Sequence, residues 1–257
     1  MRPCDVYLSP HHDDVCFSLG GQIAAGRGGH LVNIFTRSRS VTARLLLPAD
    51  EDARIRAVTR LRDTEDRRFA ALSGLTRHDL GLLDPPARGA RPFDLGGISA
   101  DVALLSPPLL DLLSTIRARE HGRSLRLFCP MAIGAHRNHL ATLLAVRQNL
   151  DWLTGFGHVL LYEDLPYASI PENRRTGLAR TFKLFQSRMG MRIVLKLQED
   201  SFRQKMERVA LYASQHSGAP QGERFTPAAG EVQVPHEAWW RVRGSTSFAR
   251  PVRASEP

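Results

Sequence analysis

The stretch that decides the fold is VYLSPHHDD, residues 6–14. Its short apolar start, residues 6–8, is typical of a strand in a parallel sheet, and the Ser-Pro pair that follows ends the strand. The next four residues, 11–14, are two histidines and two aspartates, which are metal-ligating and proton-transferring residue types. A helix is predicted to begin near Asp14 and to end at the glycines that follow Ala25. The segment therefore predicts a strand, a reactive loop and a helix.

The rest of the chain alternates short apolar runs with amphipathic stretches, which indicates βαβ units. We expect an α/β protein, a Rossmann-like three-layer sandwich with a mainly parallel sheet. Further strands are predicted at 31–35, 80–83, 125–128 and 159–162, and further helices at 50–72, 107–119, 139–150 and 200–214. Residues 165–199 are predicted to form an antiparallel strand pair over one end of the sheet, and the last apolar piece is 238–242.

Length and composition predict one domain over residues 1–257. Residues of about 165–235 are expected to form a subregion that covers the substrate, and 253–257 a frayed tail. Apolar residues make up 42% and charged residues 24% of the 257 residues, which excludes disordered, collagen-like and coiled-coil proteins. No apolar run approaches a transmembrane segment, and the first residues do not resemble a signal peptide. The three cysteines predict buried thiols in a reducing compartment, so we expect a cytoplasmic protein.

The net charge of +9 raises the question of an anionic partner. The arginines that supply most of the positive charge are scattered and interleaved with acids. We therefore expect no specific nucleic-acid partner. A binder of anionic polymers remains an alternative, and its affinity would fall steeply with salt.

A second reactive cluster, HRNH at residues 136–139, follows the strand predicted at 125–128. In a doubly wound sheet the first and fourth strands flank the point where the strand order reverses. The loops that carry residues 11–14 and 136–139 should therefore face each other across one crevice. This convergence predicts a site more specifically than either motif does alone.

Imidazole and carboxylate groups suit zinc, and another divalent metal such as iron(II) is possible. His11 and Asp14 can supply two ligands from one tight turn, and His139 can supply the third. Asp13 then remains beside the metal as a general base. His136, one helical turn before His139, is the natural acid or oxyanion stabiliser.

At these residues the chain resembles the PIG-L/LmbE-like N-acetylglucosaminyl deacetylase family. Its hallmarks are a His-Pro-Asp-Asp turn after the first strand and a later His-x-Asp-His, which correspond to residues 11–14 and 136–139. Further similarities lie at 35–37, 62–66, 162–168, 205–215 and 237–241, so the resemblance extends from about residue 5 to 242.

The resemblance implies an LmbE-like fold and a metal-dependent hydrolase that removes an N-acyl group, usually acetyl, from an amino sugar or glycoconjugate. It implies the same ligands and the same roles for Asp13 and His136, and it makes Arg62 a substrate-contacting residue. A homo-oligomer is left open. The alternative is a degenerate relative that binds metal or sugar without turnover.

The chain departs from the family pattern at several positions. His12 stands in place of proline, Val15 stands where an acid is frequent, and Asn138 replaces the aspartate between the two histidines. An amide would favour a cationic His136 less than a carboxylate would. Some members also have a tyrosine shortly before the histidine pair, where this chain has Gly134 and Ala135, so a tyrosine contact must come from elsewhere.

Overall fold

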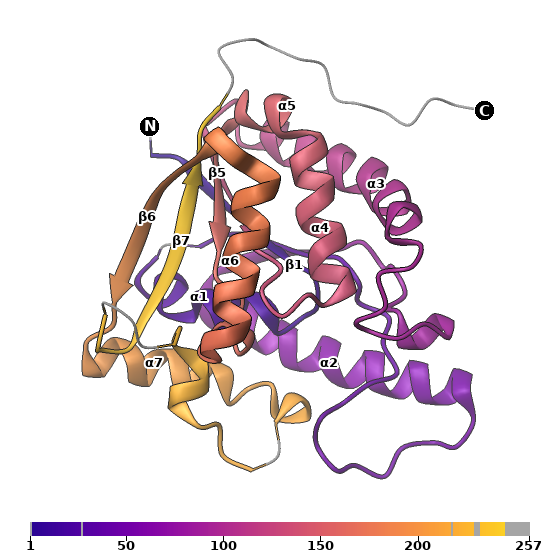
Figure 1. The fold of residues 1–257 in the computed structure, drawn as a ribbon. Coiled ribbons are helices and arrows are strands. Elements are labelled where there is room, and N and C mark those ends of the chain that lie inside the picture. Colours follow the sequence, from indigo (N-terminus) through magenta and orange to yellow (C-terminus); the bar gives the residue numbers. More distant parts are fainter. Residues whose placement is uncertain (1, 27, 217, 229–231, 245–257) are drawn as a thin grey trace, which may run out of the picture.

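The computed structural model describes residues 2–26, 28–216, 218–228 and 232–244, so the tail expected at 253–257 lies outside the described residues. Seven strands form one sheet in the order β3-β2-β1-β4-β5-β7-β6 (Figure 1). The first five in this order are parallel to one another, and β7 runs antiparallel to both of its neighbours, β5 and β6. The strands are β1 Cys4–Ser9, β2 Gly29–Asn33, β3 Leu75–Asp79, β4 Leu125–Pro130, β5 Gly157–Tyr162, β6 Met189–Lys196 and β7 His236–Val242.

Helices cover both faces of this sheet, which confirms the predicted three-layer α/β architecture (Figure 1). One layer is built from α1 (Asp14–Ala25), α2 (Glu51–Ser73) and α7 (Glu199–Val209). The other is built from α3 (Ile98–Arg119), α4 (Arg137–Gln148), α5 (Leu150–Thr154) and α6 (Pro171–Phe185). The chain crosses from one layer to the other after β3, so the strand order reverses between β1 and β4 as predicted.

Local sequence signals fix the ends of the long helix α2. The Asp50 carboxylate accepts a hydrogen bond from the Ala53 N–H at 2.7 Å and so caps the first turn. Gly74, with a φ of 63°, ends the helix in the left-handed conformation that glycine adopts without strain. The predicted helix over 50–72 is thus confirmed.

The third strand lies at Leu75–Asp79, so the prediction at 80–83 was wrong. β3 is an edge strand, and most of its side chains are polar and incompletely buried. An edge strand of this kind has a weak apolar pattern. The more apolar stretch after it contributes a single bridge, between Leu83 and Arg37.

Helix α3 begins at Ile98, nine residues before the predicted start at Pro107. Pro107 and Pro108 lie inside the helix, where they remove two backbone donors. Tertiary packing overrides that cost, because Val102, Leu105 and other apolar residues on both sides of the prolines are buried in the core. Among the described helices, α3 is the one whose length and hydropathy would allow it to cross a membrane.

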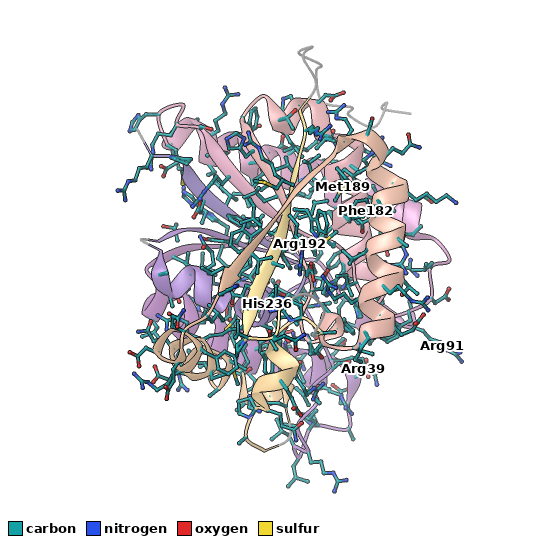
Figure 2. The ribbon with its side chains drawn as sticks, turned by 60° about the vertical axis from the view of Figure 1, so that its left-hand side comes forward. Arg39, Arg91, Phe182, Met189, Arg192 and His236 are labelled. Carbon is teal, nitrogen blue, oxygen red and sulfur yellow. The ribbon has the colours of Figure 1, made fainter. Side chains whose placement is uncertain are left out.

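Residues 165–199 do not form the predicted strand pair. They contain helix α6 and one strand, β6, whose partner is β7 at the far end of the described chain. Figure 2 shows Met189 and Arg192 along β6, His236 at the start of β7, and Phe182 on the neighbouring α6. The Phe182 ring packs edge-on against Trp240 of β7 at 4.9 Å, which holds α6 over the antiparallel end of the sheet.

Candidate metal centre and active site

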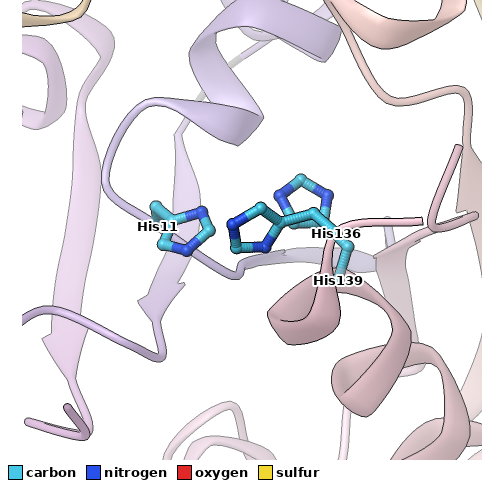
Figure 3. Close-up of side chains that lie close together, drawn as sticks. All are labelled: His11, His136 and His139. Atoms are coloured by element: carbon cyan, nitrogen blue, oxygen red, sulfur yellow. The ribbon is translucent and has the colours of Figure 1, made fainter. Parts of the chain in front are cut away.

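The two reactive loops meet at the carboxyl ends of β1 and β4, which are neighbours in the middle of the sheet. His11 lies in the loop between β1 and α1, His136 caps the N-terminus of α4, and His139 lies in its first turn. Figure 3 shows the three imidazoles converging from the two loops. Their ring centroids are 4.8 to 5.4 Å apart. The juxtaposition expected from the sequence is therefore present.

Asp14, the first residue of α1, joins the two loops. Its Oδ2 lies 3.1 Å from His11 Nδ1 and 3.2 Å from His139 Nε2, and it also accepts the backbone N–H of His11 at 2.7 Å. Burial alone would raise the pKa of Asp14, but the imidazoles of His139 and His11 hold it well below its usual range. Asp14 is therefore an anion set between two imidazoles.

Asp164, two residues after the end of β5, fixes the second of these imidazoles. Its Oδ1 lies 2.7 Å from His139 Nδ1, and its Oδ2 accepts the Ile133 N–H at 3.0 Å. Burial alone would lower the pKa of His139, but the carboxylates of Asp14 and Asp164 raise it to about 10. The sequence analysis missed this residue. The available signal was the pair of acids, Glu163 and Asp164, that follows a central parallel strand, because the ends of such strands meet at one edge of the sheet.

This donor set fits a divalent metal. Bonds of about 2.0–2.2 Å in a tetrahedral site place neighbouring ligand atoms about 3.3 Å apart, close to the spacing of Asp14 Oδ2 from the two imidazole nitrogens. A carboxylate behind a ligating histidine, as Asp164 stands behind His139, is the usual support for such a ligand. The ring nitrogens of His11, His136 and His139 also lie within 4.8 Å of one another, which makes an all-histidine set the competing arrangement.

Asn138 supports His11, and its side chain is not hydrogen-bonded to His136. Its Nδ2 lies 3.0 Å from His11 Nε2, while its buried Oδ1 has no hydrogen-bond partner. If the amide group were rotated by a half-turn, Asn138 Oδ1 would accept a hydrogen bond from His11 Nε2–H. The other ring nitrogen, His11 Nδ1, already faces Asp14 and would be the ligating nitrogen. The orphaned oxygen thus has a use if His11 ligates a metal through Nδ1.

Arg62 lies beside Asp13. Its guanidinium donates to Asp13 Oδ1 at 2.7 Å, and both side chains are almost fully buried. The same guanidinium lies 3.4 Å from the Ser38 hydroxyl, which in turn donates to Asp84. Asp13 is therefore held in one orientation next to Asp14, with Oδ2 left to accept a proton.

His136 presents a single donor. Its Nδ1 accepts the backbone N–H of Asn138 at 3.3 Å, so the ring proton resides on Nε2. Burial, together with the neighbouring His11 and His139, lowers the pKa of His136 to about 2. This shift favours the neutral ring.

A cavity of about 320 Å³ opens onto these groups. His11, Asp13, Asp14, Arg62 and His136 line it, together with Ser40, Val41, Thr42, Asp84, Pro92, Tyr167 and Arg224 among others. All of the predicted site residues except the buried His139 therefore reach one cavity.

Tyr167 enters this cavity from the segment after β5, and its ring lies 5.8 Å from that of His139. It occupies the space that a side chain at position 134 would need. A Cβ on Gly134 would come within 2.5 Å of the Tyr167 ring. A tyrosine from another part of the chain thus reaches the site, as expected from the absence of a tyrosine at positions 134 and 135.

The other two departures from the family pattern are buried. Val15 is fully enclosed in the core. His12 is 2% exposed, and its Nε2 has no hydrogen-bond partner. Burial and the nearby Arg62 lower the pKa of His12 to about 3, so it is a neutral ring that does not line the cavity.

No family model matches the chain. A 2'-N-acetylparomamine deacetylase of Streptomyces fradiae is 34% identical in an alignment of 171 residues that covers 63% of this chain and 56% of that protein. The chain thus spans just over half the length of this curated relative.

Solved structures confirm the LmbE-like fold. A deacetylase of teicoplanin biosynthesis matches with a TM-score of 0.67 at 19% identity, over 94% of this chain and 98% of that one. A zinc-inhibited form of teicoplanin deacetylase matches with a TM-score of 0.65 at 19% identity, over 94% and 98%. An A40926 pseudoaglycone deacetylase matches with a TM-score of 0.64 at 19% identity, over 97% and 100%.

Proposed function

This chain resembles the PIG-L/LmbE-like deacetylases in sequence and in fold, and we propose that it is a metal-dependent hydrolase that removes an N-acetyl group from an amino sugar or glycoconjugate. One observation carries the proposal. His11, Asp14 and His139 come from two distant loops and share one point, with Asp13 next to them and a cavity in front. A structural metal site would have no need of an additional acid held by its own arginine.

His11 Nδ1, Asp14 Oδ2 and His139 Nε2 would hold the metal, with Asp164 and Asn138 orienting the two histidines. A bound zinc ion supplies Lewis acidity toward the amide carbonyl and makes a bound water more acidic. Imidazole and carboxylate ligands also suit iron(II). Because one structural relative is described in a zinc-inhibited form, both metals and the zinc concentration have to be tested.

Asp13 is the proposed general base. Arg62 occupies its Oδ1, so Oδ2 accepts the proton of the attacking water. The buried ion pair also limits the rotation of the carboxylate, which keeps the acceptor aimed at the reacting atoms. In this arrangement Arg62 acts through Asp13, in addition to lining the cavity.

His136 is the proposed stabiliser of the oxyanion. The backbone N–H of Asn138 holds the ring proton on Nε2, so a neutral imidazole donates to the developing negative charge. The leaving amine must be protonated before the C–N bond breaks, and the proton that Asp13 accepts from the water supplies this, since a neutral His136 that lost its single ring proton would be left as an imidazolate. A neutral donor in this role does not depend on a carboxylate at position 138.

The substrate class follows from the cavity and the sequence relative. A volume of about 320 Å³ suits one sugar ring better than a complete glycopeptide. The curated relative is a 2'-N-acetylparomamine deacetylase, and we extend to this chain the class of substrate that this name indicates, an N-acetyl amino sugar within a small glycoconjugate. The three buried, unpaired cysteines support a cytoplasmic site of action.

The test is acetate release from a panel of N-acetyl amino sugars and pseudodisaccharides, with protein reconstituted with Zn²⁺ or Fe²⁺. Turnover that is lost on chelation and restored by metal supports the proposal. A wild-type protein that binds metal and sugar but releases no acetate with either metal would favour the degenerate, binding-only relative.

A further inference from the structure

A second cluster of metal-ligating side chains lies at the opposite edge of the sheet, at the amino ends of β1 and β2. Cys4 begins β1, His30 is the second residue of β2, and Glu120 follows the last residue of α3. The thiol, imidazole and carboxylate atoms of these residues lie within 4.8 Å of one another. His30 Nε2 is 3.2 Å from Glu120 Oε1.

The orientation of His30 is fixed from behind. Its Nδ1 lies 3.0 Å from Nε2 of His78 on the adjacent strand β3. A hydrogen bond there holds a proton between the two rings and leaves His30 Nε2 to face Glu120. Ligating histidines are commonly oriented in this way, by a hydrogen bond to the ring nitrogen that does not bind the metal.

The neighbouring arginines do not block the cluster. Arg123 donates to Glu120 Oε2 at 2.8 Å, and Arg126 forms a two-pronged contact with Asp5. Each guanidinium thus has its own carboxylate, and Glu120 Oε1 remains directed at His30. A cavity of about 720 Å³ is lined by Cys4, His30 and Glu120, so an ion can reach the three ligands.

We propose that Cys4, His30 and Glu120 form a second divalent-metal site, of the zinc type, that joins β1, β2 and the end of α3. Thiolate, imidazole and carboxylate are three of the usual ligands of zinc. Tetrahedral zinc would bring these atoms about 3.4–3.6 Å apart, so side-chain adjustments of about 1 Å complete the site. A water molecule from the cavity would take the fourth coordination position. The C-terminal end of α3 adds a partial negative charge that favours a cation.

The thiolate makes this site distinguishable from the candidate active site. We would titrate tag-free, metal-depleted protein with Co²⁺ and record thiolate-to-cobalt charge-transfer absorption in the near ultraviolet. His11, Asp14 and His139 contain no sulfur, and neither Cys16 nor Cys129 belongs to a group of potential ligands among the described residues. The account predicts a band that saturates at one Co²⁺ per chain.

Variants decide the assignment. The band should disappear in Cys4→Ala and His30→Ala, and it should persist in the matched control Cys16→Ala and in His139→Ala. If the buried substitutions prevent folding, Glu120→Gln changes a partly exposed side chain and should weaken Co²⁺ binding at this site at least tenfold. Absence of the band in folded wild-type protein with excess Co²⁺, or an unchanged band in Cys4→Ala or Glu120→Gln, would overturn the proposal.

Discussion

The carboxyl ends and the amino ends of the parallel strands, here called the carboxyl edge and the amino edge of the sheet, carry similar residue types in different surroundings. At the carboxyl edge His139 is backed by Asp164, and at the amino edge His30 is backed by His78. The carboxyl edge also holds Asp13 beside Asp14 and aims His136 into the cavity. Asp5 lines the same cavity as Cys4, and Arg126 occupies both of its oxygens. Arg62, by contrast, occupies only one oxygen of Asp13. The comparison teaches that ligands alone give a metal site, whereas hydrolysis needs a separate base and a separate donor.

The sharpest way to break this comparison is Asp13→Asn. We expect acetate release to fall by about 10²–10⁴-fold, because the amide cannot accept the water proton. Metal content at the carboxyl edge should stay the same, since Asp13 is not one of the proposed ligands. Steady-state kinetics and elemental analysis on the same preparation give both values. Loss of the metal in this variant would make Asp13 a ligand and would refute its role as the base.

The next effect concerns the carboxylate behind His139. We expect Asp164→Asn to weaken metal binding about 10–100-fold, because His139 loses the anionic partner of its Nδ1. Competition with a chromophoric chelator measures this change. Asp5→Asn, at the amino edge, is the control and should leave affinity at the carboxyl edge unchanged. Equal affinity of Asp164→Asn and wild type would show that Asp164 does not support the site.

Gly134→Ala tests the contact that places Tyr167. Its φ of 86° strains any side chain, and the new Cβ would overlap the Tyr167 ring. We expect a loss of about 2–4 kcal/mol in the free energy of unfolding. Gly89→Ala has a similar φ of 76° in open space and should cost only about 1 kcal/mol. Denaturant unfolding of both variants separates the cost of the contact from that of the backbone strain. Equal losses in the free energy of unfolding would show that the Tyr167 ring moves aside at no cost.

The smallest effect is expected from Glu120→Gln. Because Glu120 lies at the opposite edge of the sheet, deacetylation should change by less than about twofold under saturating metal. The midpoint of thermal unfolding in added Zn²⁺ should nevertheless rise less than that of wild type, since a ligand bound only by the folded state stabilises it. A tenfold loss of turnover would mean that the two edges are coupled.

The sequence was sufficient to predict the parallel sheet and the convergence of the two loops. The reactive residues 11–14 and 136–139 follow β1 and β4, and the loops that follow neighbouring parallel strands lie at the same edge of the sheet. It was insufficient for β3, which is a polar edge strand, and for α3, where burial of Val102 and Leu105 outweighs two prolines. Propensity acts locally, and in both elements tertiary packing decides.

Within the candidate site, the sequence pointed to residues whose type is reactive and missed those that matter by position. Asp164 and Tyr167 lie in a segment already noted as similar to the family, but only the fold brings them to His139. Asn138 shows the same limit. Its spacing suggested an effect on His136, whereas its side chain contacts His11 across the crevice. The roles of the individual site residues remain predictions.

The most direct measurement is anomalous diffraction at the absorption edge of the metal, from crystals of the protein loaded with Zn²⁺ or Fe²⁺. The account predicts a peak at the carboxyl edge within about 2.0–2.2 Å of His11 Nδ1, Asp14 Oδ2 and His139 Nε2. His136 should then stay outside the coordination sphere, facing the cavity. A peak held by His11, His136 and His139 with Asp14 apart, or no peak at this edge, would contradict it.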